Sequence, residues 1–160
     1  MTTKLHYEDL APGLVLRHTA RRTLTETDNV LSCVTIMSSE PLQLDAEFAR
    51  EVSPTGERLF NSAFTLGLML GVSTHDLHYA GLPDLGFNEI AFPHAARVGD
   101  TLRIETEVVA IDAGGPTGHA GQVTLTHRAY NQQGHLIGTA TRDVVVQCRP
   151  GRATPEDARN

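Results

Sequence analysis

The stretch that decides the fold is Leu59-Phe-Asn-Ser-Ala-Phe-Thr-Leu-Gly-Leu-Met-Leu-Gly-Val-Ser73. Its apolar side chains leave no polar face, so the pattern predicts a helix that is buried on all sides. Gly67 and Gly71 each cost about 1 kcal/mol of helix propensity relative to alanine. We expect a closely packed sheet to offset that cost, because glycine lets two backbones approach. The sequence therefore predicts a central helix wrapped by other structure.

The chain after this helix supplies the strands of that sheet. Residues 102–111 alternate apolar with polar side chains, the period of two that is typical of a half-buried strand. Further strands are predicted over 14–24 (an edge strand), 85–92, 123–130 and 136–147, with hairpin turns at 98–101 and 131–134 and a flexible loop over 113–120. One long buried helix followed by four antiparallel strands indicates an α+β fold whose sheet curls around the helix.

Short helices are predicted before the central one. Thr25 is expected to cap the first helix by accepting a hydrogen bond from the N–H of Asp28, an acid that the helix dipole favours. Val30, Val34 and Met37 then fall at helical spacing and predict an apolar face.

Pro41 ends that helix in a polar Ser-Glu-Pro turn, because proline disfavours helical geometry in the residue before it. Asp45 is expected to cap a second short helix over 45–51, and residues 53–56 predict a turn.

Composition limits the class of protein. A length of 160 residues predicts a single domain over 1–150, with a loose polar tail over 151–160. Thirteen lysine and arginine residues against 19 acidic residues give a net charge of −6, which argues against a nucleic-acid partner. The histidines have no spacing typical of a metal site, so no metal is expected.

Cellular location is predicted from the cysteines and the amino-terminal sequence. Cys33 and Cys148 lack metal-type spacing and are expected to be free thiols in a reducing compartment. The first residues contain no apolar signal segment, and the apolar run over 63–72 is shorter than the ~20 residues that span a bilayer. We expect a cytoplasmic protein that does not enter the membrane.

Several phrases over residues 7–147 together resemble the MaoC-like dehydratases. They are Leu24-Thr-Glu-Thr-Asp-Asn29, Glu40-Pro-Leu-Gln-Leu-Asp-Ala-Glu-Phe-Ala49, Gly56-Glu-Arg-Leu-Phe-Asn-Ser62, Thr65-Leu-Gly-Leu-Met69, Leu85-Gly-Phe87, Phe92-Pro93 and Val98-Gly-Asp-Thr-Leu102. The resemblance implies a hot-dog fold and hydration or dehydration of an enoyl-CoA or 3-hydroxyacyl-CoA thioester. It is greatest to members that act on small branched or dicarboxylic thioesters such as mesaconyl- or itaconyl-CoA.

The resemblance also assigns catalytic positions, and the chain departs from the family there. The family pattern Asp-x-Asn-Pro-x-His-x-Asp aligns with Pro41 and Asp45, so Ser38 occupies the Asp position, Glu40 the Asn position and Gln43 the His position. Neither Ser38 nor Gln43 titrates near neutral pH, and Gln43 can orient water but cannot take its proton. Glu40 is the carboxylate that the turn retains, either as a catalytic base or as a solvated loop acid.

Substrate-binding positions follow from the same resemblance. The family has His-Gly at the start of the central helix, where the glycine N–H binds the enolate oxygen, and here Asn61 and Ser62 occupy these positions. Either the backbone N–H of Ser62 serves that role, or Asn61 and Ser62 simply cap the helix, and the two roles are compatible. Phe64 is expected to line the acyl pocket, and Arg97 either meets a phosphate of CoA or is solvated.

The alternatives remain open at this stage. His75 and Asp76 form a second candidate acid–base pair at the far end of the central helix. The lead interpretation is a hydratase or dehydratase that needs no cofactor beyond the CoA of its substrate. A catalytically degenerate thioester-binding protein and an acyl-CoA thioesterase are the alternatives. We expect a homodimer or larger homo-oligomer, or a heteromer with a catalytic paralogue, because one curled sheet leaves an edge strand open.

Overall fold

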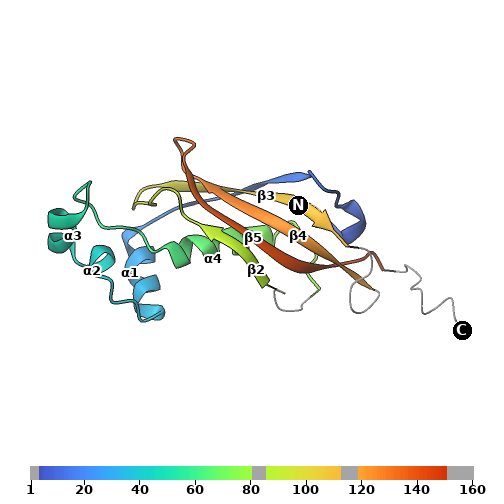
Figure 1. Cartoon of the computed structure of the whole chain (residues 1–160), viewed down its shortest axis with the longest axis horizontal. Coiled ribbons are helices and arrows are strands. Elements are labelled where there is room, and N and C mark those ends of the chain that lie inside the picture. The colour runs from blue at the N-terminus through green and yellow to red at the C-terminus, as the bar shows by residue number, and fades with distance from the viewer. Residues whose placement is uncertain (1–3, 81–85, 113–118, 151–160) are drawn as a thin grey trace, which may run out of the picture.

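The computed structural model describes residues 4–80, 86–112 and 119–150. Figure 1 shows an antiparallel sheet with helix α4 along one face, and helices α1, α2 and α3 gathered at one end of the molecule. The elements in chain order are η1 (Tyr7–Asp9), β1 (Val15–Thr23), α1 (Glu26–Thr35), α2 (Pro41–Leu44), α3 (Ala46–Val52), α4 (Ser62–Ser73), β2 (Gly86–Ala91), β3 (Thr101–Ile111), β4 (Ala120–Tyr130) and β5 (Leu136–Gln147). The predicted α+β class and the curved sheet around a central helix, the hot-dog arrangement, are confirmed.

The five strands lie in the order β1-β3-β4-β5-β2, and all four neighbouring pairs are antiparallel. Along β3, every second residue from Leu102 to Val108 is buried, while Arg103, Glu105 and Glu107 are partly exposed, which confirms the predicted alternation. The strand predicted over 14–24 is β1, and it lies at an edge of the sheet. The tip of the loop predicted over 113–120 and the tail over 151–160 lie outside the described residues, and Ala120 already belongs to β4.

One of the two hairpin predictions is wrong. The turn at 131–134 does join the paired strands β4 and β5, with Asn131 N–H donating to the carbonyl of His135 at 3.1 Å. The turn at 98–101 precedes β3, whose neighbours are β1 and β4 rather than β2. Gly99, at φ 92°, donates instead to the carbonyl of Leu24 at 2.9 Å, so this turn docks on the end of β1.

Helix α4 is not buried on all sides, which corrects the prediction. Thr65, Met69, Val72 and Ser73 are buried against the sheet, but Gly67 and Gly71 are exposed. A Cβ atom built on either glycine meets nothing within 4 Å, so these glycines do not permit a close backbone approach in this chain. The apolar composition of α4 exceeds what one sheet face covers.

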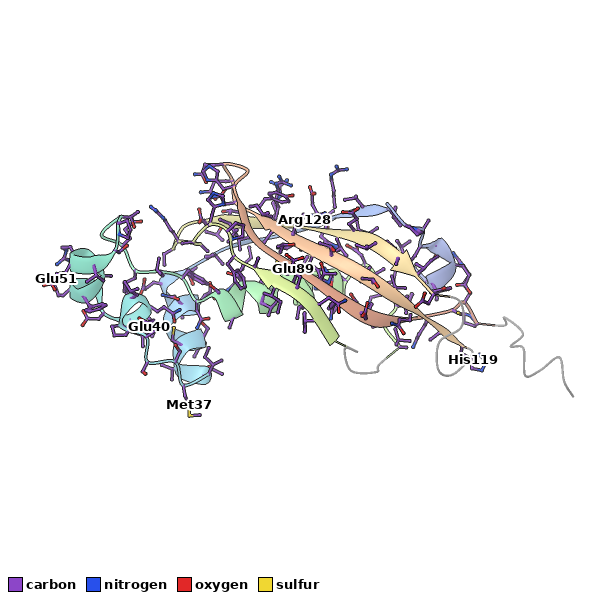
Figure 2. All side chains as sticks on the ribbon, in the orientation of Figure 1. Met37, Glu40, Glu51, Glu89, His119 and Arg128 are labelled. Carbon is purple, nitrogen blue, oxygen red and sulfur yellow. The ribbon has the colours of Figure 1, made fainter. Side chains whose placement is uncertain are left out.

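Helix α1 also differs from its predicted packing. Its predicted apolar residues Val30, Val34 and Met37 are 38 %, 65 % and 90 % exposed, and Met37 lies beyond the end of the helix. Figure 2 shows Met37 projecting from this end of the molecule. The buried side of α1 is instead formed by Asn29 and Cys33. The helix therefore turns a polar face inward, toward α2 and the start of α4.

No helix among the described residues is long and apolar enough to cross a membrane.

Candidate functional site

The candidate site lies where α1, the turn after it, α2 and the start of α4 meet. Thr25 caps α1 as predicted: its hydroxyl accepts from Asp28 N–H at 3.2 Å, and its own N–H donates to the Asp28 carboxylate at 2.9 Å. The turn then brings Ser38 back to α1, with Ser38 N–H donating to the carbonyl of Cys33 at 2.9 Å. This local geometry places the Ser-Glu-Pro turn against the side of α1 that faces inward.

Asn29 connects the three helices of the site. This side chain is 1 % exposed, and its Oδ1 accepts from the backbone N–H of Asn61 at 2.9 Å. Its Nδ2 donates to the carbonyls of Gln43 at 3.1 Å and Leu59 at 3.3 Å. A single buried amide thus holds the α2 turn and the entry to α4 in one fixed relation, as buried polar groups require hydrogen-bond partners.

Gln43 is the centre of a smaller cluster with Cys33, Ser38 and Asn61. Its Oε1 accepts from Ser38 Oγ at 3.3 Å and from Cys33 Sγ at 3.3 Å, while Asn61 Nδ2 donates to Cys33 Sγ at 3.4 Å. The structure therefore brings together Ser38, Gln43 and Asn61, three of the residues predicted for the site. Within the part of the chain that the structure describes, the Nε2 amide of Gln43 has no protein acceptor, so its hydrogens remain available.

Glu40 lies apart from this cluster. Its carboxylate accepts from Leu42 N–H at 3.3 Å and caps α2, and the residue is exposed. Figure 2 shows Glu40 at the helical end of the molecule, on the same side as Met37. Asp45 caps α3 as predicted, accepting from Glu47 N–H at 2.9 Å and Phe48 N–H at 3.0 Å, so its carboxylate is occupied.

The amino end of α4 opens on an apolar hollow. Asn61 caps the helix by accepting from Ala63 N–H at 2.8 Å, as predicted, whereas Ser62 is exposed and its backbone N–H has no acceptor among the described residues. Phe64 packs edge-to-face on Phe60, with ring centroids 5.4 Å apart. The adjacent hollow has a volume of about 310 Å³ and is lined by Asp28, Leu31, Ser32, Thr35, Ile36, Ala63 and Phe64.

The one carboxylate that lines this hollow is held ionised. Burial alone would raise the pKa of Asp28, but the hydrogen bonds from Thr25 and Arg22 outweigh it and lower the pKa below its ordinary value. Arg22 donates to Asp28 at 2.5 Å. Asp28 is therefore a structural anion rather than a proton donor.

Arg97 lies on the other side of the start of α4. The carbonyl of its neighbour Ala96 accepts from Phe60 N–H at 3.2 Å, which places the Arg97 segment beside the α4 entry. The guanidinium donates to Glu57 at 2.9 Å and is half-exposed. Arg97 lines two further hollows, of about 470 Å³ and about 240 Å³, so it is positioned at a surface that a large ligand can reach.

The second predicted pair, His75 and Asp76, does not form. Asp76 contacts the buried His18 of β1, with His18 Nδ1 and Asp76 Oδ2 2.5 Å apart, while His75 is exposed. Sequence reasoning also missed Asn29 and Cys33 as site residues. Their spacing of four along α1 puts them on one helix face, a signal that was obscured because the apolar residues of α1 indicated the opposite face.

A curved sheet around a helix, with a polar cluster at the helix start, defines a hot-dog protein with a candidate active site. The sequence profile of the MaoC-like domain matches residues 9–131. The chain therefore belongs to the MaoC-like domain family.

Individual relatives agree with this assignment. The chain is 26 % identical over 147 residues to a mesaconyl-CoA hydratase from Cereibacter sphaeroides, a match that covers 89 % of this chain but only 41 % of that protein. It is similar to the crystal structure of a MaoC-like dehydratase from Rhodospirillum rubrum, with a TM-score of 0.79, 29 % identity and coverage of 91 % and 99 % of the two chains. A Mycobacterium tuberculosis protein with a double hot-dog fold shares the fold, with a TM-score of 0.78 and 20 % identity, and the match covers 94 % of this chain and 46 % of that one.

Proposed function

We propose that this chain is a hydratase that adds water to a short, uncharged enoyl-CoA thioester, or removes it from the 3-hydroxyacyl-CoA, at the amino end of α4. The observation that carries this proposal is the pair of donors near the amino end of α4 that have no acceptor among the described residues, the Ser62 N–H and the Gln43 Nε2 amide. Ala63 and Phe64, which follow Ser62, line the apolar hollow. Membership of the MaoC-like family and the match to a mesaconyl-CoA hydratase support the reaction class.

Hydration needs a base for water, a proton for the α-carbon and donors for the enolate oxygen. The Ser62 N–H lies in the first turn of α4, where the helix dipole favours a negative charge, and it serves the enolate oxygen. The Gln43 amide orients the water. Glu40 lies outside the Gln43 cluster but in the same turn as Ser38, and it is assigned the role of base. It takes the proton as the water oxygen bonds to the β-carbon, and that proton is then delivered to the α-carbon.

The hollow supports an uncharged acyl group. Of its polar lining residues, Ser32 and Thr35 donate to their own helix at 2.9 Å and 2.7 Å, and Asp28 holds Arg22. None of the described residues that line it is a cation. Within one copy, a second carboxylate on the acyl group, as in a dicarboxylic thioester, would therefore meet no cation among the described lining residues, which is costly.

The test is hydration of crotonyl-CoA, mesaconyl-CoA and itaconyl-CoA, followed by the loss of enoyl absorbance. We expect crotonyl-CoA to be the best substrate, and Glu40→Gln to lower kcat by about 100-fold or more. Glu51→Gln, an exposed acid on α3 (Figure 2), is the matched control and should be unchanged. A preference for mesaconyl-CoA would overturn the proposal that the acyl group is uncharged. Release of free CoA would indicate a thioesterase instead.

A second candidate is a thioester-binding protein without turnover. Ser38 and Gln43, which bond to each other at 3.3 Å, occupy the positions of the usual acid and base, and neither transfers a proton near neutral pH. This candidate predicts binding of CoA thioesters without hydration. It also predicts that the double substitution Ser38→Asp and Gln43→His creates activity.

We further propose that the chain acts in the cytoplasm as a homodimer with a site formed by both copies. The other edge of β2 is open among the described strands, and Phe87 and Ile90 on it are 40 % and 42 % exposed. The double hot-dog relative carries two such units in one chain. A monomer in sedimentation at micromolar concentration would contradict this, and assembly only with a second MaoC-like chain would indicate a heteromer.

A further inference from the structure

A row of polar side chains crosses the inner face of the sheet in the middle of the core. Thr106 on β3 and His127 on β4 are directly paired and fully buried, Arg142 on β5 is 4 % exposed, and His18 on β1 is 6 % exposed. Apolar residues lie on both sides of this row: Ile104, Ala129 and Ala140 in one cluster, and Val108, Leu125 and Val144 in the other. The row divides the hydrophobic core in two, and the function proposed above does not use it.

The row is a continuous chain of hydrogen bonds. Arg142 Nε lies 3.0 Å from His127 Nε2, and His127 Nδ1 lies 2.9 Å from Thr106 Oγ1. Thr106 Oγ1 lies 2.7 Å from His18 Nε2, and His18 Nδ1 lies 2.5 Å from Asp76 Oδ2. The chain thus joins a buried guanidinium to a carboxylate just beyond the end of α4.

The direction of every donor follows from Arg142, because a guanidinium only donates. His127 Nε2 must accept, so the hydrogen of this ring is on Nδ1 and is donated to Thr106. The Thr106 hydroxyl then donates to His18 Nε2, since no other acceptor for it occurs in the described part of the chain. His18 carries its hydrogen on Nδ1 and donates to Asp76. One consistent direction runs from cation to anion.

Both ends of this chain hold the segment that follows α4. Arg142 Nη2 donates to Tyr79 Oη at 3.0 Å and to Ser73 Oγ at 3.3 Å, and the guanidinium lies 5.3 Å from the centre of the Tyr79 ring. Asp76 belongs to the same segment. The hydrogen-bond chain therefore connects residues 73–79 to the four strands that it crosses, alongside backbone hydrogen bonds from Gln147 N–H to the carbonyl of His78 at 2.8 Å and from Ala80 N–H to the carbonyl of Val145 at 3.0 Å.

We propose that this chain is an acid-sensitive latch, which adds to the backbone hydrogen bonds that hold residues 73–79 on the sheet while His127 is neutral and loosens their hold when His127 binds a proton. A protonated His127 has hydrogens on both nitrogens, so it can no longer accept from Arg142, and two cations would face each other in the core. Among the described residues, the hydrogen-bond chain surrounds His127 with polar and titratable groups: Thr106 from β3, His18 from β1, Arg142 from β5, and Ser73, Asp76 and Tyr79 from α4 and the segment after it.

Burial of the ring, then the nearby Arg142 and then His18, lower the pKa of His127 from 6.5 to about 3. Opening of the latch exposes the ring and returns its pKa to the ordinary value. Opening therefore binds one proton between pH 6.5 and about 3, and its equilibrium constant rises up to tenfold for each unit that the pH falls. The latch is closed above pH 6.5 and weakens progressively below it.

Hydrogen–deuterium exchange of residues 73–79 at pH 7.5 and pH 4.5, corrected for intrinsic exchange rates, tests the latch. We expect about a hundredfold more opening at pH 4.5 in the native protein, from one proton over two pH units. The His127→Gln variant should lose most of this increase. His94 is exposed and contacts the carbonyl of Leu136, so the control variant His94→Gln should keep the increase. Equal protection at both pH values, or the same increase in His127→Gln, would overturn the proposal.

Nitrogen-15 NMR of the native protein at pH 7.5 gives a second test that does not depend on a variant folding. Both His127 and His18 should show a protonated Nδ1 and a bare Nε2. A protonated Nε2 on His127 contradicts donation from Arg142, and a protonated Nε2 on His18 contradicts the single direction of the chain. Either result would contradict the latch proposal, and neither would bear on the proposed hydratase activity.

Discussion

Helix α4 has a polar group of residues at each end, and the two groups differ in how much of their hydrogen-bonding capacity is used. At the amino end, the Gln43 amide nitrogen and the Ser62 N–H have no protein acceptor among the described residues, and Ala63 and Phe64, which follow Ser62, line a hollow. Beyond the carboxyl end, His18, Thr106 and His127 are each bonded on both sides and closed off from solvent. The open end is suited to bind a ligand, whereas the closed end stabilises the fold.

The comparison also separates residue type from accessibility. Two buried histidines, the side-chain type that most often performs acid–base chemistry, lie at the closed end with Arg142, which stays protonated. The cluster at the open end carries amides, a hydroxyl and a thiol, and Glu40 lies outside it. Choosing a site by residue type alone would select the closed end of α4. The proposed site rests instead on donors that have no acceptor among the described residues.

The largest effect is expected from Arg142→Met. This change leaves His127 Nε2 without its donor and removes the bonds to Ser73 and Tyr79. Removing one partner of a buried charged network costs about 3–5 kcal/mol, which urea denaturation should show as a loss in the free energy of unfolding. Arg128 forms a partly exposed ion pair with Glu107 at 2.7 Å. Arg128→Met should therefore lower the free energy of unfolding by less than about 1 kcal/mol.

Thr106→Val tests whether the closed end acts as one unit. The substitution keeps the shape but leaves His127 Nδ1–H and His18 Nε2 without partners, and we expect a loss of about 2–3 kcal/mol of unfolding free energy. Thr65→Val is the matched control, because the buried Thr65 hydroxyl has no hydrogen-bond partner among the described residues. That change should be neutral or stabilising, and equal losses in both variants would contradict the contrast between used and unused polar groups.

Gln43→Met should have the smallest effect on stability and a clear effect on binding. It removes the amide that is free to donate to a ligand. The affinity for a CoA thioester should therefore fall about tenfold, which corresponds to the free energy of one hydrogen bond. The free energy of unfolding should change by less than about 1.5 kcal/mol, because Gln43 is only partly buried. Isothermal titration with Gln122→Met, a partly buried glutamine on β4, provides the control. Unchanged affinity would show that the open end is not the binding end.

Most of the helices and strands could be predicted from the local periodicity of the sequence. The alternation along β3 and the caps at Thr25, Asp45 and Asn61 are properties of neighbouring residues, and all were confirmed. The outward faces of α1 and α4 could not be predicted in this way, because periodicity shows that a face is apolar but not what covers it.

The polar row in the core corresponds to a signal in the sequence that strand predictions overlook, namely polar residues at inward-facing strand positions. Thr106, His127 and Arg142 occupy the inward phase of their strands, each between apolar residues that are buried. A polar residue in that phase indicates either a wrong register or a buried partner. Only the pairing of strands far apart in the sequence identifies the partner.

The sequence by itself determined the strands, helices α1, α3 and α4, the caps and the family pattern with its missing Asp and His, because these depend on residues close together in the chain. It did not predict the short helix α2. The tertiary structure decided that Asp76 pairs with His18 rather than with His75, and that Cys33 and Asn61 join Ser38 and Gln43. Hydrogen bonds between distant segments depend on strand order and helix placement, and no local pattern encodes either.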